Sequence, residues 1–500
     1  LNDTAIVVLM NSPIVSSFPY LQNFEAGDGN WYADGIRSSW QYGTPASPRI
    51  NKAASGTRAW KTRLYGNYND AEFSYLYSPC FDISSMTNPT LSFSLALDLE
   101  DCNAKLCDEA HVEYSADGKN WIKLGTMGAG TNWYNKNYSD NQVWNIENYT
   151  RWHVATIPLP TGFSRLRLRF VLHSDPYTSR EGIAVDDIHI YDKQYEIYDG
   201  PPYTSNAVNQ PAVNGNNWID FTDAGKVIAS INPAGQDLGS TDVQAYIFTG
   251  PVRNKHNQYY HNRNITIKPT QTVLPDSAII RFYFTDAETE LLLNAGGCAL
   301  CSKPVSAYEL GITKYDDATK TLENGDLSDN ATGDWLFITN AVKVPYDKGY
   351  YAEFRAKDFS EFWLNNGGPD HNQSLPVELI SFTATKQSNK EVKLDWITGS
   401  EANSSYYDIE LAKGNTALNQ DAFTPIGRVA SLNSPNGGRY GFTDKENNKS
   451  GIRYYRLRMV DQDGGFRYSA IRPVVFDEEI SWQVYPNPSK DIFHLICQCR

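Results

Sequence analysis

Aromatic side chains gather in one glycine- and asparagine-rich stretch of the sequence. It contains Trp133, Tyr134 and Tyr138, and Trp144 and Trp152 follow shortly after. An indole face can stack on the C–H groups of a sugar ring, and a loop position favours ligand contact. The stretch therefore predicts a sugar-binding platform at Trp133, Tyr134 and Trp152. The alternative is that these rings fill a core, which is the common place for tryptophan in a sandwich.

Three other tryptophans lie inside strand-like patterns. These are Trp60, Trp121 and Trp396. A large ring on the apolar side of a strand usually packs inward. We expect all three in cores.

Catalytic signatures are missing from the sequence. It contains no His-Glu-x-x-His, no Gly-x-Ser-x-Gly and no phosphate-binding loop. A glycosidase needs two carboxylates across a cleft, and the 58 acidic residues mark no such pair. Glu109 and Glu113 share one face of a predicted strand, as solvated surface residues do, and His256 and His261 fit a polar hairpin. We expect no catalytic residues.

Four of the seven cysteines form two close pairs. Cys102 and Cys107 make one pair, and Cys298 and Cys301 make the other. In a secreted protein, such pairs favour local disulfides. The second pair also has the spacing of half a zinc site or a redox motif, but no second Cys-x-x-Cys accompanies it. We expect two disulfides.

Length and charge narrow the class of protein. A chain of 500 residues predicts three or four domains, at ~150 residues each. The net charge of −14 excludes nucleic acid as a partner, because a phosphate backbone requires a basic face. No apolar run approaches the ~20 residues of a membrane helix, so we expect no transmembrane segment.

The first part of the chain reads as short strands. Residues 1–18 are expected to be a linker. From residue 19 to 193, turns separate strand patterns such as Thr90–Leu97, His111–Ser115 and Arg165–Leu172, and polar and apolar residues alternate in the last two. An Asp-Gly turn precedes Trp121. The pattern predicts a β-sandwich of jelly-roll type.

Several ordered motifs in this part resemble one recurring module. They are Asn23-Phe24-Glu25 with Trp31, Ala54–Trp60, Leu76–Asp82, Val112–Gly118 with Trp121, and Gly182–Ile188. The set resembles the MAM-like, concanavalin-A-like jelly rolls of extracellular bacterial proteins. The resemblance covers nearly all of residues 19–193 and implies a fold, without naming a ligand.

The same resemblance implies a structural Ca²⁺ between the first and last strands. Glu25 and the pair Asp186 and Asp187 match its positions, and Asp108 joins them if its strand is adjacent. Ca²⁺ prefers about six to eight oxygen ligands, many of them carboxylates. The alternative is that these carboxylates cap turns or accept hydrogen bonds from backbone amides.

The middle of the chain, residues 194–372, is predicted to be a second, mostly-β domain. It opens with proline, asparagine and glycine, and strand patterns such as Val243–Phe248 and Ala278–Phe284 follow. Residues 286–294 are the best helix candidate. The segments Tyr259–Asn264 and Phe359–Leu364 resemble parts of large surface proteins of Bacteroidota, which implies no activity.

The last part carries the clearest resemblance. Residues 373–477 show strands at the spacing of a seven-strand sandwich, beginning with Leu375–Phe382. They resemble the fibronectin type III-like domain that precedes the sorting domain of Bacteroidota secreted proteins. Residues 478–500, with Tyr485, Pro486, Asn487 and Pro488, resemble the start of a type A sorting domain of the type IX secretion system. The family's domain continues for several more strands, whereas this sequence stops at Arg500.

Together these patterns predict an all-β chain of tandem β-sandwich domains: a jelly roll, a second mostly-β domain and a fibronectin type III-like sandwich. The resemblance implies a secreted or outer-membrane surface-attached protein. Its expected partners are the type IX secretion machinery and surface glycans or lipopolysaccharide. The leading hypothesis is a non-catalytic adhesin, carbohydrate-binding protein or surface-assembly protein. The alternatives are the accessory region of a secreted protease or glycosidase and a structural subunit of a surface assembly.

Overall fold

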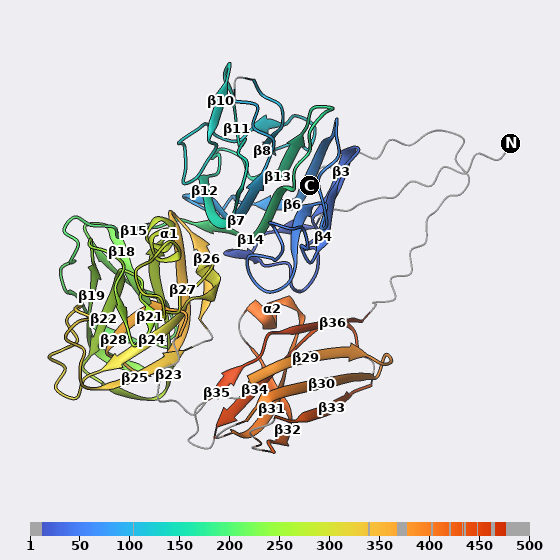
Figure 1. Ribbon diagram of the computed structural model, residues 1–500. Helices are drawn as coiled ribbons and strands as arrows, with labels where there is room; N and C mark the ends of the chain where they lie inside the picture. The colour runs from blue at the N-terminus through green and yellow to red at the C-terminus, as the bar shows by residue number, and fades with distance from the viewer. Residues whose placement is uncertain are drawn as a thin grey trace. The chain divides into compact units, whose positions relative to one another are not determined.

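The computed structural model describes residues 13–476 apart from residues 104, 339–340, 368–377, 402–403, 420–421, 433, 435–436, 448 and 462–465. Strands dominate and helices are short, which confirms the all-β prediction (Figure 1). The chain divides into two compact units, unit 1 up to residue 371 and unit 2 after it. The sorting motif Tyr485–Pro488 lies outside the described residues. None of the helices in the described part of the chain is long and apolar enough to span a membrane.

The first sandwich of unit 1 consists of two sheets. Sheet one has the order β1 (Ile14–Val15), β6 (Phe73–Asp82), β13 (Arg165–His173), β8 (Glu109–Ser115) and β9 (Ile122–Lys123), with β3 (Tyr32–Ile36) also paired to β6. Sheet two has the order β12 (Tyr149–Pro158), β7 (Pro89–Asp98), β14 (Gly182–Asp192), β5 (Ala59–Thr62) and β4 (Trp40–Gly43), with β2 (Tyr20–Gln22) on β14. A hairpin of β10 (Lys136–Tyr138) and β11 (Asn141–Val143) stands apart. Strand β1 falls inside the stretch expected to be a linker.

Alternation along the strands separates a core side from an outer side. Leu166, Leu168 and Phe170 of β13 are fully buried and pack in the jelly-roll core. The residues between them, including Arg167 and Arg169, point to the other side of sheet one, because successive side chains of a strand alternate. Sheet one therefore has an outer face of its own.

The second sandwich of unit 1 also has two sheets. One has the order β15 (Glu196–Ile197), β18 (Lys226–Asn232), β23 (Val273–Thr285), β27 (Gly349–Asp358) and β26 (Val342–Tyr346), with β17 (Ile219–Asp223) on β18. The other has the order β16 (Val208–Asn214), β19 (Asp237–Ile247), β22 (Arg263–Pro269), β28 (Glu361–Asn365), β24 (Gly311–Asp316) and β25 (Asp334–Ile338). A two-stranded hairpin pairs β20 (Asn254–Lys255) with β21 (Gln258–Tyr259).

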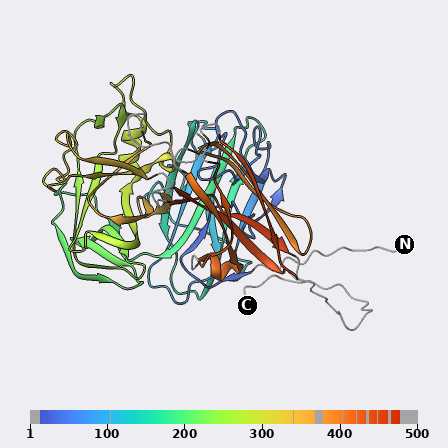
Figure 2. The same cartoon turned by 90° about the horizontal axis from the view of Figure 1, so that it is seen from below.

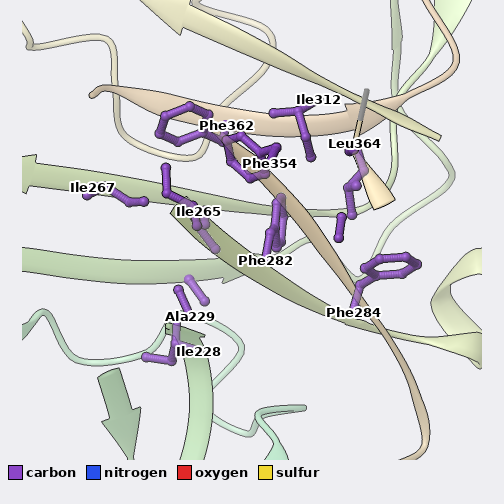
Figure 3. Packing of buried hydrophobic residues seen from close by; sticks show 14 of the residues in the cluster. Ile228, Ala229, Ile265, Ile267, Phe282, Phe284, Ile312, Phe354, Phe362 and Leu364 are labelled. Atoms are coloured by element: carbon purple, nitrogen blue, oxygen red, sulfur yellow. The ribbon is translucent and has the colours of Figure 1, made fainter. Parts of the chain in front are cut away.

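Both sheets contribute to the core between them. Figure 3 shows Ile265 of β22 and Phe362 of β28 close to Phe282 of β23 and Phe354 of β27. Ile265, Phe282 and Phe362 are fully buried. Each fully buried apolar side chain of this size contributes about 1.5–3 kcal/mol to folding.

The predicted helix is present as α1 (Asp286–Leu293). It starts at a capping box, in which Thr285 accepts from the Glu288 amide and Glu288 accepts from the Thr285 amide. Such a box satisfies two of the amides that a helix start leaves unpaired. A 3₁₀ turn, η1 (Ala307–Glu309), follows later in the chain.

Buried polar contacts join the two sandwiches of unit 1. Arg151 on β12 forms an ion pair with Asp286 at 3.2 Å, and the hydroxyls of Ser94 and Tyr308 are 2.6 Å apart. His189 Nδ1 lies 2.7 Å from the Pro345 carbonyl oxygen. These contacts explain why both sandwiches belong to one compact unit.

Unit 2 is a smaller sandwich, drawn in orange and red in Figures 1 and 2. One sheet pairs β29 (Glu378–Lys386), β30 (Glu391–Ser400) and β33 (Arg439–Lys445). The other pairs β32 (Thr424–Ala430), β31 (Ser404–Lys413), β34 (Gly451–Asp461) and β35 (Phe466–Tyr468), with β36 (Arg472–Phe476) on β34. A short helix, α2, spans Gly414–Asn419. Trp396 is buried in the core of this sandwich, as expected.

Candidate functional site

The aromatic residues of the predicted sugar platform lie in the interior. Trp133 and Tyr134 belong to the jelly-roll core, where they are 1% and 5% exposed. Trp133 Nε1 and Tyr134 Oη each donate a hydrogen bond to the Leu124 carbonyl at 2.9 Å. Trp152 is 5% exposed and donates from Nε1 to the Lys52 carbonyl. The prediction of an exposed platform at these side chains is wrong, because backbone carbonyls satisfy their polar atoms inside the fold.

Three of the four predicted calcium ligands accept hydrogen bonds from one loop. The loop is residues 54–58. Asp186 accepts hydrogen bonds from two backbone amides of this loop, at 3.0 and 3.2 Å. Asp187 accepts one from a serine hydroxyl of the loop at 2.7 Å. Glu25 accepts two from further loop amides, at 2.8 and 2.7 Å. Burial raises the pKa of Asp187 to about 6. These contacts match the hydrogen-bonding alternative that the sequence leaves open.

Asp108 belongs to a different cluster. One oxygen from each of Glu100, Asp108 and Asp175 lies within 4.8 Å of the others. Asp108 is fully buried and accepts hydrogen bonds from the Asp175 amide and the Tyr68 hydroxyl. Burial raises the pKa of Asp108 to about 7, since the charged form loses its water. Carboxylate oxygens grouped in this way are of the kind that a hard cation such as Ca²⁺ prefers.

The two cysteine pairs are joined as disulfides. The sulfur atoms of Cys102 and Cys107 are 1.96 Å apart, and those of Cys298 and Cys301 are 2.03 Å apart. These are the pairs that the spacing predicts. With its sulfurs bonded to each other, the Cys-x-x-Cys pair has no thiolate available for zinc.

A site that the sequence analysis missed lies on the outer face of sheet one. Phe73, Tyr75 and Tyr77 alternate along β6 and point to the same side, and Phe73 is 41% exposed. Trp121, expected in the core, also lies on this side and is only half-buried. We call this set the aromatic face; it consists of Tyr32, Phe73, Tyr75, Tyr77, Trp121, Arg167 and Arg169.

Arg169 occupies the centre of the aromatic face. Its guanidinium carbon lies 3.9 Å from the centroid of the Tyr75 ring and 4.2 Å from that of the Trp121 ring. Nη1 donates to the Tyr77 hydroxyl at 3.0 Å, and Nε donates to Glu113 at 2.6 Å. Each guanidinium–ring contact contributes about 0.5–2 kcal/mol, depending on burial. The rings are thus held by a cation between them.

Carboxylates compensate much of the positive charge on this face. Burial would raise the pKa of Glu113, but hydrogen bonds from His111 and Arg169 outweigh that effect and lower it. Arg165, at the edge, pairs with Asp82 at 3.3 Å. Arg169 and Arg165 are thus paired with carboxylates, whereas Arg167 donates to the neutral Ser78 carbonyl. The pairing of Arg169, at the centre of the face, favours stacking there over attraction of ions.

Register across sheet one assembles this site from distant segments. Arg169 lies opposite Tyr77 on one side and Glu113 on the other. Tyr32 on β3 lies opposite Tyr77, and their rings stack with centroids 5.1 Å apart. The pattern Phe-x-Tyr-x-Tyr in β6 was the sequence signal for an aromatic strand face.

Comparison with known proteins gives partial matches. No family model matches the chain. Bacillopeptidase F of Bacillus subtilis (strain 168) is 28% identical over 175 residues, which are 35% of this chain and 11% of that protein. The chain thus spans about a tenth of the length of this curated relative.

Among solved structures, the K2 cleaved adhesin domain of Lys-gingipain is similar to part of this chain. The match covers 35% of this chain and 97% of that domain, with 16% identity and a TM-score of 0.22. For dimeric latent PorU from Porphyromonas gingivalis, the match covers 91% of this chain and 34% of the PorU chain, with 9% identity and a TM-score of 0.17. Scores this low carry no argument about function. The chemistry of the site rests on its own residues.

Proposed function

We propose that this chain is a non-catalytic binding part of a secreted or surface-attached protein, and that its aromatic face binds neutral glycans. The supporting observation is Arg169, held between the rings of Tyr75 and Trp121 on an exposed sheet face and neutralised by Glu113. Rings fixed in this way offer flat apolar area without further loss of side-chain freedom, which is what stacking on a sugar requires.

The resemblance of Leu375–Phe382 and Tyr485–Pro488 supports export by the type IX secretion system. The proposal therefore includes the secretion machinery as a partner and attachment to lipopolysaccharide as the destination. The partial match to bacillopeptidase F favours a second candidate, in which the chain is the accessory region of a secreted protease. In both cases, the chain binds and does not catalyse.

A glycan array tests the proposed face. The wild-type chain should bind neutral oligosaccharides, and Tyr75→Ala should weaken binding at least about tenfold, or ~1.4 kcal/mol. Tyr65→Ala is the matched control, because this tyrosine is 75% exposed in the loop between β5 and β6. Equal binding by all three proteins would remove the aromatic face from consideration.

A structural Ca²⁺ remains part of the proposal, with Glu100, Asp108 and Asp175 as its best ligands. A ligand that binds only the folded state raises its stability. Thermal unfolding should therefore shift to lower temperature with a chelator and recover with added Ca²⁺. An unchanged melting curve would count against this ion.

A further inference from the structure

The second sandwich of unit 1 contains a pocket of about 760 Å³. The end of β19, the β20–β21 hairpin and the loop of residues 324–328 surround it. Its lining includes Tyr246, Phe248, Arg253, Lys255 and Asp326. We call it the Arg253 pocket. Its volume falls in the range of about 300–1,000 Å³ that small-molecule sites occupy.

Two cations hold the loop of residues 324–328 in place. Arg253 Nη1 donates to the Gly325 carbonyl at 2.9 Å, and Lys255 Nζ donates to the Leu327 carbonyl at 2.9 Å. The Arg253 guanidinium carbon also lies 4.5 Å from the centroid of the Trp363 ring. Both cations are thereby fixed by neutral partners, and the pocket wall is formed before a ligand arrives.

Arg253 and Lys255 form no ion pair with any carboxylate in the part of the chain that the structure describes. The buried Nε–H of Arg253 has no acceptor among those residues either. Two cations and one carboxylate, Asp326, line the pocket, and Asp329 and Glu361 act on the cations from outside the lining. Burial lowers the pKa of Arg253 to about 10 and also lowers the pKa of Lys255, as expected of desolvated cations.

Glu361 and Asp329 act on Arg253 and Lys255 respectively without forming ion pairs with them. Glu361 accepts hydrogen bonds from the Asn264 side chain, the Gly325 amide and the Asn330 side chain, rather than from Arg253. Burial raises the pKa of Glu361 to about 7, so a large fraction is uncharged at neutral pH. An anion in the pocket would supply the ion-pair partner that Arg253 and Lys255 lack within the described residues.

The remaining lining suits a sugar ring. Phe248 is 44% exposed and presents a ring next to Arg253, whose guanidinium carbon is 5.1 Å from its centroid. Asn324 and Asp326 provide amide and carboxylate groups that can bond hydroxyls. We propose that the Arg253 pocket binds an acidic sugar unit, with a carboxylate or sulfate near Arg253 and Lys255 and the sugar ring against Phe248.

Calorimetry on the whole chain tests this inference with three tetrasaccharide probes: a galacturonate oligomer, a sulfated heparin fragment and neutral maltotetraose. We expect at least one acidic probe to bind, and salt to weaken that binding. We expect no binding of maltotetraose in this pocket. The preferred acidic probe distinguishes carboxylate from sulfate. Free acetate or sulfate binding as tightly as the tetrasaccharides would overturn the sugar assignment, and no acidic binding would overturn the site.

Variants locate the binding. Lys255→Gln should weaken acidic binding at least tenfold, and Phe248→Ala should do the same without changing the melting temperature. Lys268→Gln is the matched control, because Lys268 also donates to a carbonyl of this segment, that of Glu323, but does not line the pocket. Equal losses for Lys255→Gln and Lys268→Gln would assign the effect to the loop and contradict the pocket. Tyr75→Ala on the aromatic face should leave acidic binding unchanged, so failure here is separable from failure of the proposed function.

Discussion

The aromatic face and the Arg253 pocket both combine an arginine with aromatic rings, but they treat the charge differently. Arg169 lies between two rings and is paired with Glu113 at 2.6 Å. Arg253 also contacts two rings, yet its side chain donates only to neutral oxygens, those of two backbone carbonyls and the Asn264 side chain, among the described residues. Arg169 consequently has its counter-charge in contact, whereas Arg253 has no carboxylate within ion-pair distance among the described residues. The partner of each arginine, more than the arginine itself, sets the class of ligand that we propose for its site.

The largest expected effect comes from Gly325→Ala. Gly325 has a φ of +91°, and an added Cβ would lie 2.4 Å from the Tyr246 ring, so the loop must move away. Acidic binding should fall about a hundredfold, or ~2.7 kcal/mol, while neutral binding on the aromatic face stays unchanged. Calorimetry with both probes measures the two sites separately.

The control for this variant is Gly215→Ala. Gly215 has a φ of +84° but nothing within 4 Å of an added Cβ, so it reports the backbone strain alone. Loss of acidic binding in Gly215→Ala as well would mean that general destabilisation explains both.

Trp121→Ala should produce the reverse selectivity. It removes one of the two rings that hold Arg169 and part of the flat surface. Neutral glycan binding should weaken about tenfold, and binding of acidic probes to the Arg253 pocket should not change. Parallel titrations check this, and equal losses at both sites would show that the sites are not independent.

Glu113→Gln should make the aromatic face resemble the pocket. Without the carboxylate, Arg169 keeps its rings but loses its counter-charge. We expect a new, salt-sensitive affinity for acidic oligosaccharides, about fivefold above that of the wild-type face, because an uncompensated cation attracts anions more strongly. The measurement uses Lys255→Gln as background so that the pocket is silent. No gain in that background would contradict the role assigned to charge pairing.

The smallest effect is a pH dependence restricted to the pocket. The pKa of Glu361 is raised to about 7 by burial, so acidification from pH 8 to 6 removes a negative charge behind Arg253. Acidic binding should strengthen about threefold over this range, since a nearby charge is lost. Glu361→Gln should flatten the dependence of acidic-probe affinity on pH. An unchanged dependence in that variant would point to another titrating group.

The raised pKa of Glu361 also makes the free energy of unfolding depend on pH. A carboxylate whose folded pKa lies above its unfolded value binds more protons in the folded state, so its contribution is present at low pH. That contribution declines as the pH rises from the ordinary glutamate range to about 7. As the pH rises from the ordinary glutamate range to about 7, the wild type should therefore lose stability relative to Glu361→Gln, and urea unfolding of both proteins measures this difference.

Local patterns predicted much of the fold. Alternation in Arg165–Leu172 predicted a two-sided strand, and β13 confirms it. Residues 286–294 predicted a helix, and α1 occupies nearly all of them. These features depend on neighbours in the sequence, so periodicity and capping suffice.

The sites could not be predicted in the same way. Trp133 and Trp121 both follow turn-rich sequence, yet the first is in the core and the second on the surface, because the burial of each depends on distant segments. Arg253 meets Gly325 across more than seventy intervening residues, with no local signature at either end. Strand alternation shows which side chains share a face of the strand. Long-range packing then decides which of the two faces is covered.

The buried contacts between the sandwiches of unit 1 add one consequence for binding strength. Arg151 and Asp286, like Ser94 and Tyr308, tie the sandwich with the aromatic face to the sandwich with the Arg253 pocket. A polysaccharide that carries both neutral and acidic units and spans the two sites would meet the second at high effective concentration after engaging the first. Such a polymer should be retained by avidity even where each site alone is weak, and cutting it into single units should release it.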